Sequence, residues 1–224
     1  MFTYLINRRR YTGMKKTQII TLFIIFASFA LAIYLYPQMP DQMASHWDAS
    51  GKVNGTMFKF WGLFLMPIIS VGVWLIMIVI PKLDPKKANI AEFRQSFDTF
   101  ILLLVLFLFY IFALTLIWNL GRTFDFIVAI IPAFAILFYY IGELIGSAKQ
   151  NWSIGIRTPW TLSSETIWNK THKLGGKMFK GGSVLCLLGL LMKDYAIWFV
   201  ILPAIGVALF LFIYSYLEFK KEVH

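Results

Sequence analysis

The feature that most constrains this chain is a series of long, almost uncharged apolar stretches. A helix that crosses a bilayer needs roughly 20 mostly apolar residues, and six segments reach or approach that length. Hydrophobic residues fill 59% of the 224 positions and charged residues 14%, whereas soluble domains average about 25% charged residues. The apolar segments leave no room for a separate soluble catalytic domain. We predict an all-α fold, a polytopic membrane protein built as a bundle of six transmembrane helices.

The predicted spans and their connections account for almost the whole chain. The spans are expected at residues 17–36, 61–80, 97–118, 126–145, 176–192 and 196–217. The fifth is the shortest and contains Lys180, so it crosses the bilayer only if its lysines extend to the interface. The other segments are expected to be a basic tail (1–16), an extracellular loop (37–60), two cytoplasmic loops (81–96 and 146–175) and a C-terminal tail (218–224).

The distribution of the basic residues predicts the orientation. Of the 21 Lys and Arg residues, 16 lie in the two tails and in the second and fourth connections when Lys177, at the start of the fifth span, is counted with the fourth connection, and 4 lie in the alternate connections. This positive-inside pattern places both termini of a multipass protein of the cell membrane in the cytoplasm. Because the basic residues follow the membrane edges, we expect them to face lipid phosphates rather than nucleic acid.

The N-terminal region allows two other interpretations. The first span resembles a signal peptide with an Ala30-Leu31-Ala32 cleavage site, but its apolar run continues through Tyr36, which favours a retained helix. Met14-Lys15-Lys16 resembles an ordinary start of a membrane protein, so residues 1–13 can be an extension from an alternative start. Both interpretations leave the later spans unchanged.

The 37–60 loop carries turn signals and one histidine. Gly51 and an Asn-Gly pair are typical of turns, so we expect a compact extracellular structure. His46 lies between Asp41 and Asp48 in the sequence. This spacing allows a metal ligand or a base oriented by a carboxylate, and the alternative is a structural histidine bonded within the loop.

The 146–175 loop is expected to contain a cytoplasmic amphipathic helix at the membrane interface. Thr161 or Ser163 can cap this helix, with Glu165 in its first turn. Its apolar face consists of Ile167, Trp168, Thr171 and Leu174. The tryptophans of the region are Trp152, Trp160 and Trp168. They are either interfacial anchors or part of a partner-binding surface, and we expect His172 to be a packed or surface residue.

Two ionisable residues lie within the predicted spans. Glu143 belongs to the fourth span and Lys180 to the fifth, and Glu143 can meet Lys180 or Arg157. The two residues either belong to a proton or ion path or extend their charges to the interface. The Gly142-x-x-x-Gly146 spacing is typical of a close contact between membrane helices.

The sequence contains no fingerprint of the common enzyme classes. It has no nucleophile elbow, P-loop, zinc-protease histidine pair or dinucleotide-binding motif. The single cysteine, Cys186, excludes an intramolecular disulfide and a cysteine-based zinc cluster. We therefore predict a non-enzymatic protein without a cofactor or a bound metal.

Three segments together resemble one known family. The inner motif reads Asn151-x-x-x-Gly155-x-Arg157-Thr158-Pro159-Trp160-Thr161-Leu162, followed by Trp168 and Lys170-Thr171. The outer motif reads Tyr36-Pro37-x-x-Pro40, followed by His46-Trp47 and Gly51. The second loop reads Pro81-Lys82-Leu83-Asp84-Pro85-Lys86-Lys87-x-Asn89. In this order, on six spans, the motifs resemble the SdpI family, the sporulation-delaying-protein immunity proteins.

The resemblance implies a multipass membrane protein that protects the producing cell against a secreted peptide toxin, and that can also act as a receptor holding a transcriptional repressor at the membrane. The implied binding residues are Pro40, His46, Trp47 and Gly51 outside and Asn151, Gly155, Arg157, Thr158, Pro159, Trp160, Thr161 and Trp168 inside. The chain departs from the family at Asp48, where many relatives have Asn, and at Glu143, where small or neutral polar residues are usual. The alternative function is a small transporter or channel for a toxic peptide or ion.

Overall fold

Six long apolar helices dominate the structure, a computed structural model that describes residues 2–223 and the side chains of residues 16–222. Each helix is long and apolar enough to cross a membrane, which confirms the predicted number of spans. The candidate spans are Lys16–Gln38, Lys59–Leu83, Arg94–Asn119, Phe126–Ser147, Glu165–Leu191 and Lys193–Glu222.

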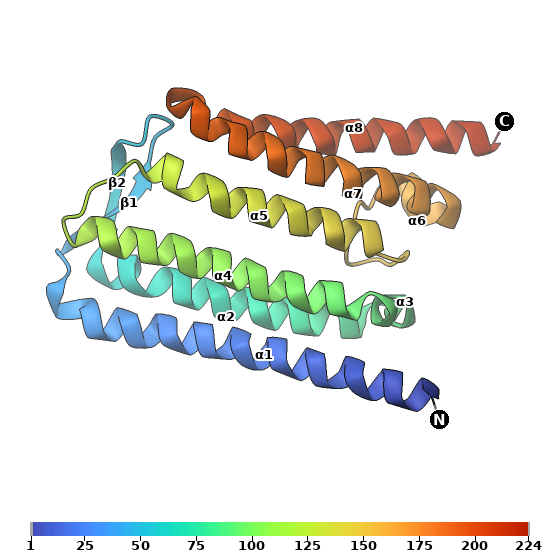
Figure 1. Ribbon diagram of the computed structural model, residues 1–224, viewed down its shortest axis with the longest axis horizontal. Helices are drawn as coiled ribbons and strands as arrows, with labels where there is room; N and C mark the ends of the chain where they lie inside the picture. Colours follow the sequence, from blue (N-terminus) through green and yellow to red (C-terminus); the bar gives the residue numbers. More distant parts are fainter. Residues whose placement is uncertain (1, 224) are drawn as a thin grey trace. The chain divides into compact units, whose positions relative to one another are not determined.

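Helices form most of the described chain, and one pair of strands accompanies them. The α-helices are α1 (Phe2–Leu35), α2 (Lys59–Leu83), α3 (Lys87–Glu92), α4 (Arg94–Asn119), α5 (Phe126–Ser147), α6 (Pro159–Ser163), α7 (Glu165–Leu188) and α8 (Trp198–Val223). The strands are β1 (Gln42–Trp47) and β2 (Val53–Phe58), and the short 3-10 helices are η1 (Tyr36–Gln38), η2 (Gly189–Leu191) and η3 (Lys193–Tyr195). The described chain forms two compact units: the first contains the residues up to Met77 with Asp98–Ile130, and the second contains Ile78–Phe97 with the residues from Ile131 on. The helices and strands are labelled in Figure 1.

The first helix begins well before the predicted first span. α1 starts at Phe2, so the backbone of residues 2–16 of the predicted basic tail belongs to the same helix. The side chains of four residues used in the orientation prediction lie outside the described residues: Arg8, Arg9, Arg10 and Lys15. A helical tail agrees with the favourable helix propensity of Arg and Lys.

The predicted surface helix and the predicted fifth span form one continuous helix, α7. The expected boundary after residue 175 is therefore not a helix end. Gly175 and Gly176 lie inside α7. Neighbouring groups approach both residues so closely that a side chain would not fit without a shift. A Cβ on Gly176, for example, would lie 2.9 Å from the carbonyl oxygen of Gly142 in α5. These glycines serve helix packing and do not terminate the helix.

The 37–60 loop folds into a β-hairpin, which the turn signals predicted only as a compact structure. β1 and β2 pair antiparallel, and His46 lies opposite Gly55. The register is irregular on both sides of His46. Such bulges interrupt the alternation of apolar and polar residues by which a strand is recognised in a sequence.

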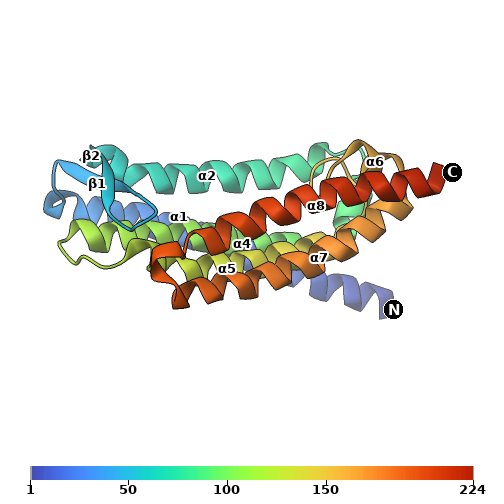
Figure 2. The ribbon, with the colours of Figure 1, turned by 90° about the horizontal axis from the view of Figure 1, so that it is seen from above.

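The first unit holds the hairpin against helices α1, α2 and α4 (Figures 1 and 2). Its core includes Met39 just before the hairpin, Met43 of β1, Leu63 of α2 and Phe112 of α4, each at most 3% exposed. Gly62 of α2 permits this packing, because a Cβ there would lie 2.7 Å from the Met43 sulfur. The hairpin is therefore a packed part of its unit.

In the second unit, α7 and α8 lie side by side and antiparallel (Figures 1 and 2). The C-terminal part of α5 packs on α7 through glycines, since a Cβ on Gly142 would lie 2.6 Å from the Gly176 carbonyl oxygen. A Cβ on Gly176 would also lie 3.0 Å from the Cα of Gly146. This close approach confirms the helix contact predicted from the Gly142-x-x-x-Gly146 spacing.

Candidate functional site

Two polar regions, one in each unit, contain the predicted binding residues. The first, the hairpin site, consists of β1, β2 and the turn between them, with Pro40 just before β1. The second, the loop site, consists of residues 84–89, the irregular segment 148–158, α6 and the first turns of α7. The two sites use their polar side chains in different ways.

His46 lies on the exposed side of the hairpin site and has one polar partner within the described residues. Its Nδ1 lies 2.5 Å from the Asn54 amide oxygen, so Nδ1 carries the proton of this hydrogen bond. Neither neighbouring carboxylate orients the ring. Asp41 pairs with Lys59 at 2.9 Å, and Asp48 is bonded within the turn. The structure therefore contradicts a base oriented by either carboxylate, and the ring is bonded locally, within the hairpin.

Asp48 organises the turn between the two strands. One of its carboxylate oxygens accepts the Ser50 hydroxyl at 2.7 Å, the Ser50 N–H at 2.9 Å and the Lys52 N–H at 3.0 Å. The hydrogen bond from the Ser50 hydroxyl, followed by that from the Lys52 backbone, lowers the pKa of the Asp48 carboxyl below its ordinary value. Gly51 completes the turn with a φ of +78°, a conformation that favours glycine.

Trp47 and Ala44 anchor the hairpin to the ends of neighbouring helices. The Trp47 ring is buried and stacks on Phe126 with 3.7 Å between ring centroids, and it meets Trp118 edge-on at 5.7 Å. The Asn119 side chain acts like a neighbouring strand: its oxygen accepts the Ala44 N–H at 2.7 Å, and its nitrogen donates to the Ala44 carbonyl at 3.0 Å. Trp47, which the resemblance implied as a binding residue, is thus an internal anchor.

The outer surface of the hairpin site is partly apolar. Phe58 is 69% exposed, and Pro40 is also exposed. The Asp41 side chain is 94% exposed although it pairs with Lys59. An aromatic ring, a histidine and a carboxylate on a packed backbone are groups that a peptide can contact.

In the loop site, Asp84 connects two segments that are distant in the sequence. Its Oδ1 accepts the Lys86 N–H at 2.7 Å. Its Oδ2 accepts the Trp152 N–H at 2.9 Å and the Ser153 hydroxyl at 2.5 Å. The side chain is buried, so these hydrogen bonds replace the water that the carboxylate loses.

Gln150 strengthens the same connection. Its amide nitrogen donates to the carbonyls of Thr161 and Leu162 at 2.9 and 3.0 Å, and its amide oxygen accepts from the Lys86 ammonium group. The Asn89 side chain donates to the Gln150 carbonyl at 2.8 Å. The second-loop motif and the inner motif therefore form one hydrogen-bonded cluster.

Asn151 uses all four hydrogen-bonding positions of its amide group. Its oxygen accepts the N–H groups of Ser153 at 2.8 Å and Ile154 at 2.6 Å. Its nitrogen donates to the carbonyls of Lys149 at 2.8 Å and Ile154 at 2.9 Å. Because the residue is completely buried, it shapes the loop from within and offers no polar group to a partner.

A stacked pair of rings lies beneath the loop. Trp168 and His172 are parallel within 14°, with 3.8 Å between centroids, and both are fully enclosed. His172 Nε2 accepts the Ile156 N–H at 3.0 Å, so the proton is on Nδ1, which donates to the Trp168 carbonyl at 2.9 Å. Gly155 has a φ of +122°, and a Cβ there would collide with His172 Nε2. His172 is thus a packed residue, as predicted.

Thr158 and Thr161 form a capping box at the start of α6. The Thr158 hydroxyl accepts the Thr161 N–H at 3.2 Å, and the Thr161 hydroxyl accepts the Thr158 N–H at 2.9 Å. The Thr158 hydroxyl also lies 3.0 Å from that of Ser215 in α8. Trp160 packs on two aromatic rings of α8, with centroid distances of 5.1 and 5.0 Å. These residues dock α6 on α8.

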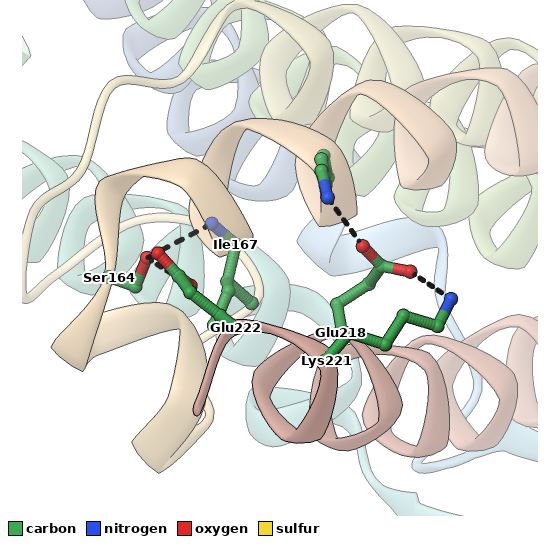
Figure 3. Close-up of polar contacts among 6 residues, drawn as sticks. Ser164, Ile167, Glu218, Lys221 and Glu222 are labelled. Atoms are coloured by element: carbon green, nitrogen blue, oxygen red, sulfur yellow. Dashed lines mark hydrogen bonds and ion pairs between the residues drawn. The ribbon is translucent and has the colours of Figure 1, made fainter. Parts of the chain in front are cut away.

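Ser164 caps α7, in place of the predicted Thr161 or Ser163 (Figure 3). Its hydroxyl accepts the Ile167 N–H at 3.3 Å and donates to the Glu222 carboxylate at 2.8 Å. Glu218, which also belongs to α8, extends its carboxylate toward α7 (Figure 3).

Glu218 is a buried acceptor for two lysines. Its two oxygens accept from Lys170 and Lys221, each at 2.7 Å, while its side chain is 7% exposed. The ion pair between Lys170 and Glu218 joins α7 to α8. Electrostatic attraction therefore adds to packing in holding the C-terminal helix against the loop site.

Only part of the inner motif faces outward. Trp152 is 54% exposed, and Arg157 and Pro159 are exposed as well. Arg157 donates to the Trp152 carbonyl at 2.8 Å and has no carboxylate partner within the described residues. The inner residues that are used internally are Asn151, Gly155, Thr158, Thr161 and Trp168.

Glu143 and Lys180 form an ion pair between α5 and α7. The Lys180 Nζ lies 2.5 Å from the Glu143 carboxylate and 5.4 Å from the centroid of the Tyr139 ring. Of the two partners predicted for Glu143, Lys180 is the one that it contacts. Pairing lowers the cost of holding both charges within candidate membrane spans.

Sequence reasoning did not single out Asn119, Gln150 or Glu218. A polar residue near the end of an apolar stretch is common, so their local sequence gives no specific signal. Asp84 belongs to the second-loop motif, and Asp84-Pro85 is a turn signal. The hydrogen-bond partners of Asp84 in residues 152–153 cannot be predicted from the sequence. Among the described residues, no group of three His, Cys, Asp or Glu side chains is arranged to hold a metal ion.

Comparisons with known proteins match two separate parts of the chain. The model of the SdpI/YfhL protein family matches residues 147–216, and that of a domain of unknown function (DUF1648) matches residues 23–71, which include the hairpin. Immunity protein SdpI of Bacillus subtilis (strain 168) is 27% identical over 207 residues, covering 92% of this chain and 97% of that protein. No solved structure matches the chain. The family match on the inner motif and the similarity to immunity protein SdpI over nearly the full length of both chains make this chain a distant homologue of that protein.

Proposed function

We propose that this chain is an immunity protein that protects its cell against a secreted peptide toxin. The observation that carries the proposal is the similarity to immunity protein SdpI over nearly the full length of both chains. The six candidate transmembrane helices support a protein that acts within the membrane. The two matched family models include the hairpin site and most of the loop site, so both regions enter the proposal.

The proposed orientation places both termini in the cytoplasm. Its support is the excess of Lys and Arg, 16 against 4, in alternate connections. The hydrogen bond between Asp84 and Trp152 agrees with this topology, because it joins the connections after the second and fourth spans. The hairpin follows the first span, so it faces the outside and the loop site faces the cytoplasm.

The hairpin site is the proposed contact for the toxin. Met43, Trp47 and the Asn119 side chain hold it in one conformation, so little conformational entropy is lost when a peptide binds. Exposed His46 and Phe58 offer a polar and an apolar contact on this surface.

The exposed part of the loop site is the proposed contact for a cytoplasmic partner, a repressor held at the membrane. Arg157 and Trp152 are residue types that contribute much of the binding energy of protein interfaces. Arg157 has donors to spare, because its described hydrogen bond uses one of them. Within the described residues no carboxylate pairs with Arg157, so its charge is available to an acidic group of such a partner.

The test of the immunity function uses the gene in its own organism. We expect cells that lack the gene to lose viability in culture supernatant of the parent strain, and the wild-type chain to restore survival. His46→Gln should insert into the membrane normally but fail to protect, while Lys193→Gln, an exposed control outside the hairpin, should protect fully. Equal survival of deletion and parent cells would refute the immunity function.

The inner contact is tested separately with Arg157→Gln and with Lys82→Gln, an exposed control outside the loop site. We expect the Arg157 variant alone to reduce the amount of cytoplasmic protein that copurifies with the membrane-embedded chain. Unchanged copurification together with full protection in the Arg157 variant would exclude a binding role for this residue.

A further inference from the structure

A groove in the surface of the second unit has no role in the immunity function proposed above. It lies between α7 and α8, has a volume of about 520 Å³ and falls within the candidate membrane spans. Its walls are apolar and include Met178, Gly181 and Leu185 of α7 and Pro203, Gly206 and Val207 of α8. This volume lies within the range of about 300–1,000 Å³ of small-molecule sites.

Two glycines open the groove without serving helix packing. Gly142 and Gly176 have close neighbours that explain the absence of a side chain, as described above. A Cβ on Gly181 or Gly206, in contrast, would meet nothing within 4 Å. Glycine is among the least favourable residues inside a helix, so two glycines without packing partners, facing one groove from two helices, indicate space kept for an occupant.

Cationic groups lie beside one end of the groove. Lys177 precedes Gly181 by one helical turn on the same side of α7, and Lys173 lies a further turn away. Both lysines are exposed and, within the described residues, have no carboxylate partner. Lys170 and Lys180 differ from them, because Glu218 and Glu143 neutralise their charges.

We propose that one acyl chain of an anionic phospholipid occupies this groove, with its phosphate group against Lys177 and Lys173. An apolar channel within the membrane matches the hydrocarbon chain, and the unpaired lysines match the phosphate and the negative headgroup. A second, entirely apolar helix in the groove would cover the channel but supply no counter-charge to the two ammonium groups. The lipid also explains why the two lysines are unpaired while the lysines on either side of them in α7 are not.

The experiment is native mass spectrometry of the full chain in detergent, titrated with phosphatidylglycerol or with phosphatidylcholine of the same acyl chains. We expect phosphatidylglycerol to be retained preferentially. Lys177→Gln should weaken its binding about fivefold, the effect of one basic residue near an anionic headgroup. Gly206→Leu or Gly181→Leu should fill the groove and weaken binding of this lipid by about tenfold or more, because several methylene contacts are lost.

Matched controls separate this site from general lipid adhesion. Lys193→Gln removes a charge elsewhere, and Gly72→Leu adds the same side chain in α2, where a Cβ also meets nothing within 4 Å. Both should retain phosphatidylglycerol like the wild type. Equal retention of the two lipids by the wild type, or full retention by both groove variants, would overturn the proposal. A wild-type chain that proved to be a dimer, together with a monomeric Gly206→Leu variant of unchanged lipid binding, would also overturn the proposal, because the occupant would then be a second copy.

Discussion

The hairpin site and the loop site both carry motif residues, but they differ in where those residues direct their polar groups. His46 of the hairpin is exposed and has one hydrogen bond, to a neighbouring strand. Asn151 of the loop is completely buried and makes four hydrogen bonds to its own loop. A motif residue can therefore hold the fold or meet a partner, and the sequence pattern does not distinguish the two roles.

This difference changes how the predicted binding residues are understood. Most of the predicted inner binding residues form an internal framework; Arg157 and Pro159 are the exposed ones among them, next to the exposed Trp152. In the hairpin, Trp47 is the anchor, while Pro40 and His46 face outward. Substitutions in the framework should lower stability, and substitutions of the outward residues should change recognition alone.

The largest loss of stability is expected for Gly155→Ala. The backbone conformation disfavours any side chain, and the new Cβ would collide with His172, so the free energy of unfolding should fall by about 3 kcal/mol or more. Thermal unfolding of the purified chain in detergent measures the effect. Gly72→Ala, in open space, is the matched control. An unchanged melting temperature would show that the loop is not a rigid framework.

Asp84→Asn should cause the second largest loss of stability. An amide can accept on one side only, so its NH₂ group must face either the Lys86 N–H or the donors of Trp152 and Ser153. We expect a loss of about 2–3 kcal/mol, since a buried donor is left unsatisfied. The same thermal assay should show almost no change for Asp41→Asn, whose side chain is 94% exposed. Equal effects of the two substitutions would remove the distinction between the sites.

Asn119→Ala tests whether the hairpin depends on its anchor. The substitution breaks both hydrogen bonds to Ala44 and should cost about 1–2 kcal/mol. Hydrogen exchange of the β1 amides should accelerate, while exchange in residues 148–158 should not change. Slow exchange of β1 in this variant would mean that the apolar contacts hold the hairpin without Asn119.

His46→Gln should leave the melting temperature almost unchanged, within about 0.5 kcal/mol, because the side chain is exposed and its one hydrogen bond is local. Combined with a loss of protection, this result would assign His46 to recognition. A large drop in melting temperature would instead place His46 with the framework residues.

The smallest effect concerns pH. Because the folded chain lowers the pKa of Asp48 below its ordinary value of 3.8, the ionised carboxylate stabilises the turn above that pH. This contribution is lost as the pH falls through the lowered pKa. Asp48→Asn keeps an acceptor oxygen for the Ser50 and Lys52 donors, so we expect the turn to persist. Comparison of melting curves from pH 6 to pH 3 should show a slightly weaker acid dependence in the variant, and an identical dependence would contradict the assignment.

Sequence reasoning succeeded where the physics is local. An apolar stretch long enough to cross the bilayer must be helical there, because the hydrocarbon core offers no other partner for backbone groups. This rule alone predicted six spans, and the glycine spacing in α5 predicted a helix contact that is confirmed. The helix ends were less accurate, since α7 absorbs the segment expected to be a separate surface helix.

By itself, the sequence determined the membrane class, the number of spans, the family motifs and the asymmetry of charge, because each depends on composition and spacing along the chain. Only the tertiary structure decided which motif residues are framework and which are surface. Asp84 finds its donors in residues 152–153, and Asn119 finds its partner in Ala44. Such pairings depend on how distant segments pack, and burial and hydrogen bonding together then assign the role of each side chain.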